Sequence, residues 1–187
     1  MMSKQSEKIY QLKITLSYIK PPVWRRVLVP GDTTLEELHH ILLTIMGWDG
    51  YHLHEFSISG TSYGSREQDT WGELDFEDEA DFTLAQVLPA EKLKGSYTYD
   101  FGDDWRHEIL VEKILPRDEN MRYPLCVTGK RACPPEDIGG PPGYQFFLEA
   151  IHDPANEEHE RYLEWIGGAF DPEAFDLNDI NDQLHQL

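Results

Sequence analysis

Strict alternation of apolar and polar residues marks the beginning of the chain. Over residues 9–19 the apolar side chains occupy every second position, which is typical of a strand with one buried face. A Pro-Pro pair interrupts the pattern, and residues 23–29 predict a second strand that ends at a Pro-Gly pair. Because the break between them is short, we expect the two strands to pair in antiparallel fashion.

The apolar spacing then changes from two residues to three and four. Between Leu35 and Met46 this spacing predicts an amphipathic helix. Thr33 and Glu36 fit a capping box, in which each side chain satisfies an otherwise unpaired backbone N–H. Gly47 is suited to end the helix, because glycine readily adopts the left-handed conformation found at helix ends.

The remainder of the chain predicts shorter elements. Alternation indicates strands at residues 52–59, 97–101 and 105–115, the last two joined as a hairpin by Gly102-Asp103-Asp104. Segments rich in Gly, Ser, Pro or acidic residues predict loops, at residues 60–81 and 126–143. Helices or helical turns are expected at residues 82–88, 144–151, 154–166, 172–175 and 177–184.

This order of elements predicts one α+β domain over residues 1–187. A hairpin followed by a long helix that crosses one face of a mixed sheet is the β-grasp-like plan, which we assign to residues 8–116. Residues 117–187 would add a Pro/Gly loop and an acidic helical region packed on the sheet, since each sheet face must bury its apolar side.

The charge of the chain narrows the classes of function. Sixteen Lys and Arg residues face 35 Asp and Glu residues, a formal net charge of −19. Such a surface repels phosphate backbones, so we expect no direct binding of nucleic acid. An acidic mimic of DNA remains an alternative. We see neither an apolar signal sequence nor a run of about 20 apolar residues, and we expect a cytoplasmic protein without contact to a membrane.

Four segments together carry a resemblance to a known family: KPPVWRR at residues 20–26, YDFGDDWRH at 99–107, GKRACPPEDIGGPPG at 129–143 and WIGGAFDP at 165–172. In this order they resemble the plasmid pRiA4b ORF-3-like family, over nearly the whole chain. The resemblance implies an α+β fold and a link to mobile DNA, because some relatives are labelled as insertion-element passenger or TnpR (resolvase-like) proteins. It implies no catalytic residues. Members often carry a Cys where this chain has Ile138, which weakens the case for a family metal site.

His52 and His54 form the first of two candidate metal sets. The two residues would point to the same face of a strand, which is a spacing that metal ligands use. His54 also shares that face with Phe56 and Ile58, so a partly buried structural histidine is the alternative. We identify no catalytic constellation in the chain and expect no cofactor.

Cys126 and Cys133 form the second metal set, in which His152 and His159 could complete four zinc ligands. The spacing of the two cysteines is wider than in the tight pairs of zinc ribbons. Buried, inert thiols are therefore the alternative. A metal-binding protein or metal-dependent enzyme stays open beside the main prediction.

The function that we predict is an accessory or protein-interaction module with a protein partner, in an oligomeric state that the sequence leaves open. A sheet crossed by one helix leaves its other face partly free. Aromatic and Arg side chains carry most of the binding energy at such surfaces. The alternative is that both tryptophans belong to the core. The candidate interaction residues are Trp24, Arg26, Trp105, Arg106, His107 and Tyr144.

Overall fold

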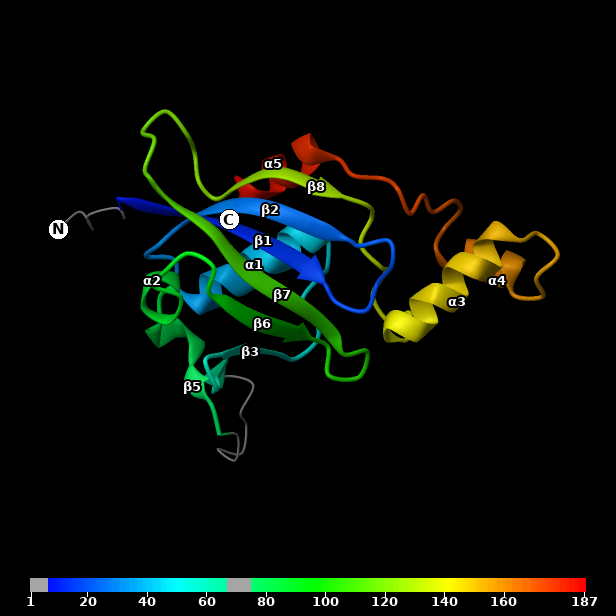
Figure 1. The fold of residues 1–187 in the computed structure, drawn as a ribbon. Helices are drawn as coiled ribbons and strands as arrows, with labels where there is room; N and C mark the ends of the chain where they lie inside the picture. The colour runs from blue at the N-terminus through cyan, green and yellow to red at the C-terminus, as the bar shows by residue number, and fades with distance from the viewer. Residues whose placement is uncertain (1–6, 67–74) are drawn as a thin grey trace.

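One large sheet forms the body of the molecule (Figure 1). The structure is a computed structural model that describes residues 7–66 and 75–187. The described residues form a mixed α+β fold with eight strands in one sheet and five α-helices. No described helix has the length and apolar character needed to cross a membrane.

The strands and helices follow one another along the chain with only short connections in the first half. The strands are β1 (Lys8–Leu16), β2 (Trp24–Pro30), β3 (His54–Ile58), β4 (Thr61–Gly64), β5 (Glu77–Asp78), β6 (Lys94–Tyr99), β7 (Trp105–Pro116) and β8 (Leu125–Lys130). The helices are α1 (Leu35–Met46), α2 (Leu84–Val87), α3 (Gly140–His152), α4 (His159–Trp165) and α5 (Leu177–Leu184), with a short 3-10 helix η2 (Glu79–Asp81).

Strand β1 lies inside the sheet, whose order is β5-β4-β3-β6-β7-β1-β2-β8. It is antiparallel to both neighbours, so that Lys13 lies opposite Arg26 on β2 and Leu110 on β7. The predicted antiparallel pair of the first two strands and the 97–115 hairpin are therefore both confirmed. Only β4 and β5 run parallel. The β-grasp-like plan stays a prediction, because β1 has no parallel neighbour in this sheet.

Helix α1 covers one face of the sheet and buries the predicted apolar stripe, including Leu38 and Leu42. Its capping box lies one residue later than predicted. The Thr34 hydroxyl accepts a hydrogen bond from the Glu37 N–H at 3.1 Å, and the Glu37 carboxylate accepts one from the Thr34 N–H at 2.9 Å. Gly47 ends the helix with a φ of 81°, as predicted.

Two predicted loops contain regular structure. Within residues 60–81 lie β4, β5 and η2, and the part at 67–74 lies outside the described residues. The Pro/Gly-rich segment 126–143 begins with β8, which pairs with β2 at the edge of the sheet. Helix α3 starts at Gly140 rather than at residue 144, because proline is tolerated in the first turn, where backbone N–H groups have no helical partner.

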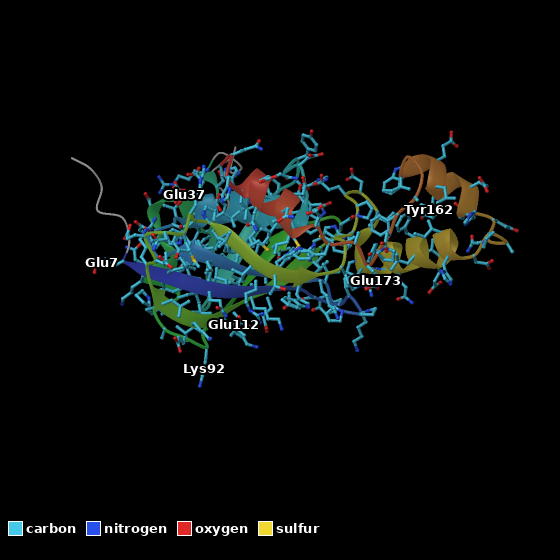
Figure 2. All side chains as sticks on the ribbon, turned by 90° about the horizontal axis from the view of Figure 1, so that it is seen from above. Glu7, Glu37, Lys92, Glu112, Tyr162 and Glu173 are labelled. Carbon is cyan, nitrogen blue, oxygen red and sulfur yellow. The ribbon has the colours of Figure 1, made fainter. Side chains whose placement is uncertain are left out.

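The C-terminal helices occupy two separate places. Helix α5 packs against α1 and β8, and the Asn181 side chain exchanges two hydrogen bonds, of 2.8 and 2.9 Å, with the backbone of Cys126. Helices α3 and α4 pack on each other and project beyond one end of the sheet (Figure 1). Figure 2 shows Glu112 of β7 on the side of the sheet away from α1 and α5. The sheet face opposite α1 is thus left open by the described helices.

Candidate functional site

The open face of the sheet carries the first candidate site, at the middle of strands β1, β2 and β7. Arg25 of β2 points the other way and donates a 2.9 Å hydrogen bond to the Ile45 carbonyl in the last turn of α1. Because side chains alternate along a strand, Trp24 and Arg26 must lie on the open face. Both are half-buried there.

Five side chains, which we call the Trp24 face, form one contact group: Gln11, Lys13, Trp24, Arg26 and Glu112. The Trp24 ring has Lys13 Nζ at 5.2 Å and Arg26 Cζ at 5.3 Å from its centroid, which is within the range of cation–π attraction. Arg26 also grips Glu112 through two hydrogen bonds of 2.5 and 2.8 Å, and Gln11 donates a third at 2.8 Å. The bond from Arg26 lowers the pKa of Glu112, so the pair is ionised at neutral pH.

Three of the predicted interaction residues lie in the core. Trp105, His107 and Tyr144 are each 1% exposed. The prediction that they belong to a surface patch is therefore wrong, and for Trp105 the core alternative is right. Their orientation follows from strand alternation, because the neighbouring Arg106 takes the open face and pairs with Asp104 at 2.9 Å. Of the six candidates, Trp24, Arg26 and Arg106 remain available to a partner.

The buried face of the sheet contains a polar network under α1. The ring of His39 stacks on that of His54, with centroids 3.5 Å apart, and its Nδ1 lies 2.8 Å from the Tyr97 hydroxyl. His54 Nε2 lies 2.8 Å from the Glu79 carboxylate, and both side chains are 2% exposed. His54 is thus a structural core histidine. The structure does not support His52 and His54 as a metal pair, since their imidazoles have different partners.

Burial keeps two histidines of this region neutral. Desolvation, followed by the charges of His54 and His40, lowers the pKa of His39 to about 3. Desolvation lowers the pKa of His107 to about 4, although its Nδ1 bonds the Tyr97 carbonyl at 3.2 Å. A neutral, enclosed imidazole serves packing rather than acid–base chemistry near pH 7.

The second metal set does not assemble either. Cys126 Sγ lies 3.7 Å from the Thr128 carbonyl, and Cys133 Sγ lies 3.5 Å from Met46 Sδ. Burial raises the pKa of Cys126 to about 11 and that of Cys133 to about 12, so both are thiols at neutral pH and not metal-binding thiolates. His159 bonds the Ala150 carbonyl at 2.9 Å. In the described part of the chain these cysteines join no metal-ligand group with histidine.

A second candidate site lies where three loops meet, at residues 48–52, 100–104 and 134–140, which we call the loop junction. Trp48 Nε1 donates to the Pro134 carbonyl at 2.9 Å. Glu136 accepts hydrogen bonds from the Asp49 N–H, at 3.0 Å, and from the Tyr99 hydroxyl. These bonds hold the 134–140 loop, part of one sequence motif, against the hairpin turn of another.

Glycine lets the backbones approach closely at the loop junction. The Gly139 N–H donates to Asp103 Oδ2 at 3.0 Å. A Cβ on Gly140 would lie 2.3 Å from the Asp103 carbonyl oxygen, and its φ is +67°. Only glycine meets both conditions without strain. The contact brings Asp137 toward His52, whose Nε2 is 3.1 Å from Asp137 Oδ1.

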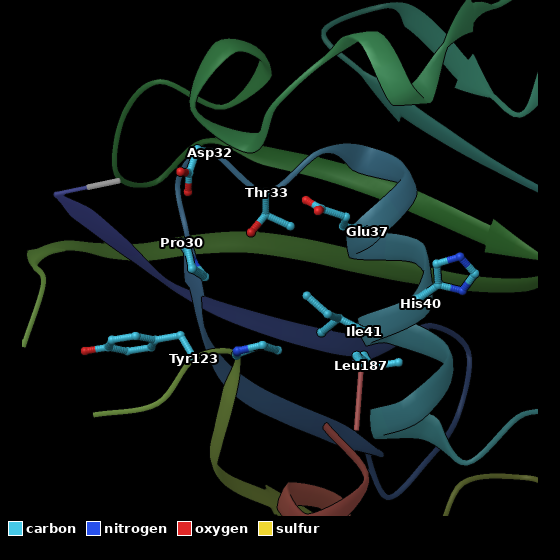
Figure 3. Close-up of a pocket in the computed structure, with 9 residues that line it drawn as sticks. Pro30, Asp32, Thr33, Glu37, His40, Ile41, Tyr123 and Leu187 are labelled. Atoms are coloured by element: carbon cyan, nitrogen blue, oxygen red, sulfur yellow. The ribbon is translucent and has the colours of Figure 1, made fainter. Parts of the chain in front are cut away.

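A hollow of about 590 Å³ opens elsewhere, between α1 and the segment before β8 (Figure 3). It contains none of the predicted site residues. Figure 3 shows Glu37 and His40 of α1 facing Tyr123 across it. No group of metal ligands is found in its described lining, and we assign it no role.

The fold and the two candidate sites define an α+β protein built on one mixed sheet with an open face and a junction of three loops. The family model described as "Plasmid pRiA4b ORF-3-like protein" matches residues 8–179, and the chain belongs to this family. The resemblance noted from the four sequence segments is thereby confirmed.

Two relatives extend over almost the whole chain. The uncharacterized protein y4hQ of Sinorhizobium fredii (strain NBRC 101917 / NGR234) is 37% identical over 180 residues, which cover 96% of this chain and 92% of y4hQ. The crystal structure of MM3350, a protein of unknown function from Methanosarcina mazei Go1, superposes with a TM-score of 0.84 at 40% identity. That match covers 93% of this chain and 98% of MM3350. Neither relative has an assigned activity, so the function is argued from the sites.

Proposed function

We propose that this protein is a protein-interaction module that binds a protein partner through the Trp24 face. The observation that carries this proposal is the position of Trp24 on an open sheet surface, with a cation against each side of its ring. Tryptophan and arginine dominate binding energy at interfaces, because each buries a large area and keeps a polar handle. Within this proposal the protein acts in the cytoplasm as an accessory to mobile DNA, without contacting DNA itself.

The chemistry of the Trp24 face defines the partner. Arg26 is already paired with Glu112, whereas the Lys13 ammonium contacts the Trp24 ring. A carboxylate of the partner would pair with Lys13, while an apolar side chain would cover the ring. Two cations and one anion make this face slightly positive on a chain of net charge −19, which favours an acidic contact at this place. The partner is thus a folded protein with a carboxylate beside an apolar residue.

The register of the sheet orients such an interface. Thr15 lies opposite Trp24, and Lys13 lies opposite Arg26 and Leu110. These positions form two adjacent rows across β1, β2 and β7. Held by backbone pairing on both sides, β1 gives the face a rigid base, so binding would require little ordering of the backbone.

A photo-reactive amino acid at residue 13 tests this proposal in cells. We expect it to cross-link to one protein species, and we expect the same amino acid at His40, exposed on α1, not to reach that species. Replacing Trp24 with Ala in the residue 13 variant should abolish the cross-link. The proposal fails if residue 13 yields only nucleic-acid adducts, no adduct, or the same protein adduct without Trp24.

A further inference from the structure

We infer that His52, Asp100 and Asp137 form a binding site for a divalent transition-metal ion. The three residues come from the three segments of the loop junction, and each offers one ligand atom. The imidazole nitrogen and two carboxylate oxygens all lie within 4.8 Å of one another. One imidazole with two carboxylates is a donor set that suits zinc and manganese ions.

The distances match those between neighbouring ligands of one metal ion. Ligand atoms about 2.1 Å from a metal lie about 3.0 Å apart at a right angle and about 3.4 Å apart at a tetrahedral angle. His52 Nε2 lies 3.1 Å from Asp137 Oδ1 and 3.6 Å from Asp100 Oδ2. The shorter distance would also fit a hydrogen bond, but 3.6 Å is too long for one. A hydrogen-bonded triad therefore explains one contact and leaves the other unexplained.

Asp100 presents an unused oxygen to this site. Its residue is 8% exposed, and its Oδ1 accepts hydrogen bonds from the N–H groups of Gly102, at 2.9 Å, and Asp103, at 3.2 Å. Among the described residues, no N–H or O–H group lies within hydrogen-bond distance of Oδ2. A nearly buried carboxylate oxygen without a partner is unfavourable, and a metal ion would satisfy it. The bonds to Oδ1 would fix the ligand, as outer hydrogen bonds do in metal sites.

The site is open on one side. The Asp137 side chain is 72% exposed and that of His52 is 29% exposed, so an ion can enter from solvent and keep water ligands. Asp49 and Glu136 add negative charge to the same junction, where Glu136 accepts the Asp49 N–H bond. This charge favours a cation over a neutral ligand.

Zinc titration of the tag-free, chelator-treated full-length protein tests the inference by calorimetry. We expect one ion per chain, bound more tightly for zinc than for manganese or magnesium, in line with the general order of divalent affinities. His52→Gln, Asp100→Asn and Asp137→Asn should each weaken zinc binding at least tenfold. His152→Gln, which changes an exposed histidine at the end of α3, should leave the affinity unchanged.

The highly exposed Asp137 keeps this test decisive even if Asp100→Asn impairs folding. Thermal unfolding of the metal-free variants will show that Asp137→Asn and His52→Gln are folded. The inference is overturned if zinc binds with the same affinity to these folded variants, if His152→Gln weakens it equally, or if no saturable binding occurs.

Discussion

Replacing Trp105 with Ala is expected to destabilise the protein by about 3–5 kcal/mol, the usual cost of removing a large buried aromatic side chain. Trp105 is 1% exposed, and its ring lies 5.9 Å from that of Trp48 under α1. The cavity left behind would be enclosed by the sheet and the helix, which cannot collapse into it freely. Urea unfolding followed by circular dichroism measures this loss.

Arg106→Ala is the matched control for that experiment. Arg106 is the next residue of β7, exposed on the open face and paired only with Asp104 at 2.9 Å. An exposed ion pair contributes about 0–1 kcal/mol, so this variant should unfold near the wild-type urea concentration. Equal destabilisation by the two substitutions would contradict the assigned orientation of β7.

Acidification from pH 7 to pH 5 is expected to remove about 4 kcal/mol of stability through His39 and His107, about 2 kcal/mol for each. In the unfolded chain a histidine titrates near pH 6.5. In the folded protein, burial lowers the pKa of His39 to about 3 and that of His107 to about 4. Below pH 6.5 the unfolded chain therefore binds protons that the folded protein does not. Stability is complete above pH 6.5 and falls as the pH drops toward the folded pKa values.

Asparagine substitutions isolate this effect. In His39→Asn and His107→Asn the amide can replace Nδ1, which bonds the hydroxyl of Tyr97 in one case and its carbonyl in the other. Each variant should lose about 2 kcal/mol less than wild type between pH 7 and pH 5. His40→Asn, at an exposed neighbouring position, should keep the full pH dependence. An unchanged dependence in both core variants would show that these histidines are not held neutral.

The alternating strands were predictable because one buried face imposes period two on the sequence. In β1, residues such as Leu12 and Ile14 face α1, while Gln11 and Lys13 face the open side. Strand β8 carries no comparable pattern, since it lies at the edge and is fixed by the Asn181 side chain of α5. That contact joins residues 55 positions apart, and no local pattern contains it.

The start of α1 shows how local signals can be ambiguous. Thr33 with Glu36 and Thr34 with Glu37 have the same spacing, and each pair could form a capping box. The structure uses the second pair, while the Thr33 carbonyl accepts a hydrogen bond from the Leu84 N–H at 2.8 Å. A tertiary contact thus accompanies the choice between two equal local alternatives.

The candidate sites were only partly predictable for the same reason. Trp24 and Arg26 could be placed on one face by counting along a strand, but the count does not say which face is covered. His52 was recognised as a metal candidate, yet its partners Asp100 and Asp137 come from segments far along the chain. Asp137 reaches His52 because the 134–140 loop docks on the hairpin turn, and that docking depends on Gly140.

The affinity of the cross-linked partner for the purified protein tests the central claim most directly. The dissociation constant should rise at least about 30-fold in Trp24→Ala, as expected for a binding hot spot of about 2 kcal/mol. Tyr51→Ala removes an aromatic residue that is 82% exposed and lies outside the Trp24 face, and it should leave the constant unchanged. Equal affinities for wild type and a folded Trp24→Ala variant would contradict the assignment of the Trp24 face as the partner-binding surface.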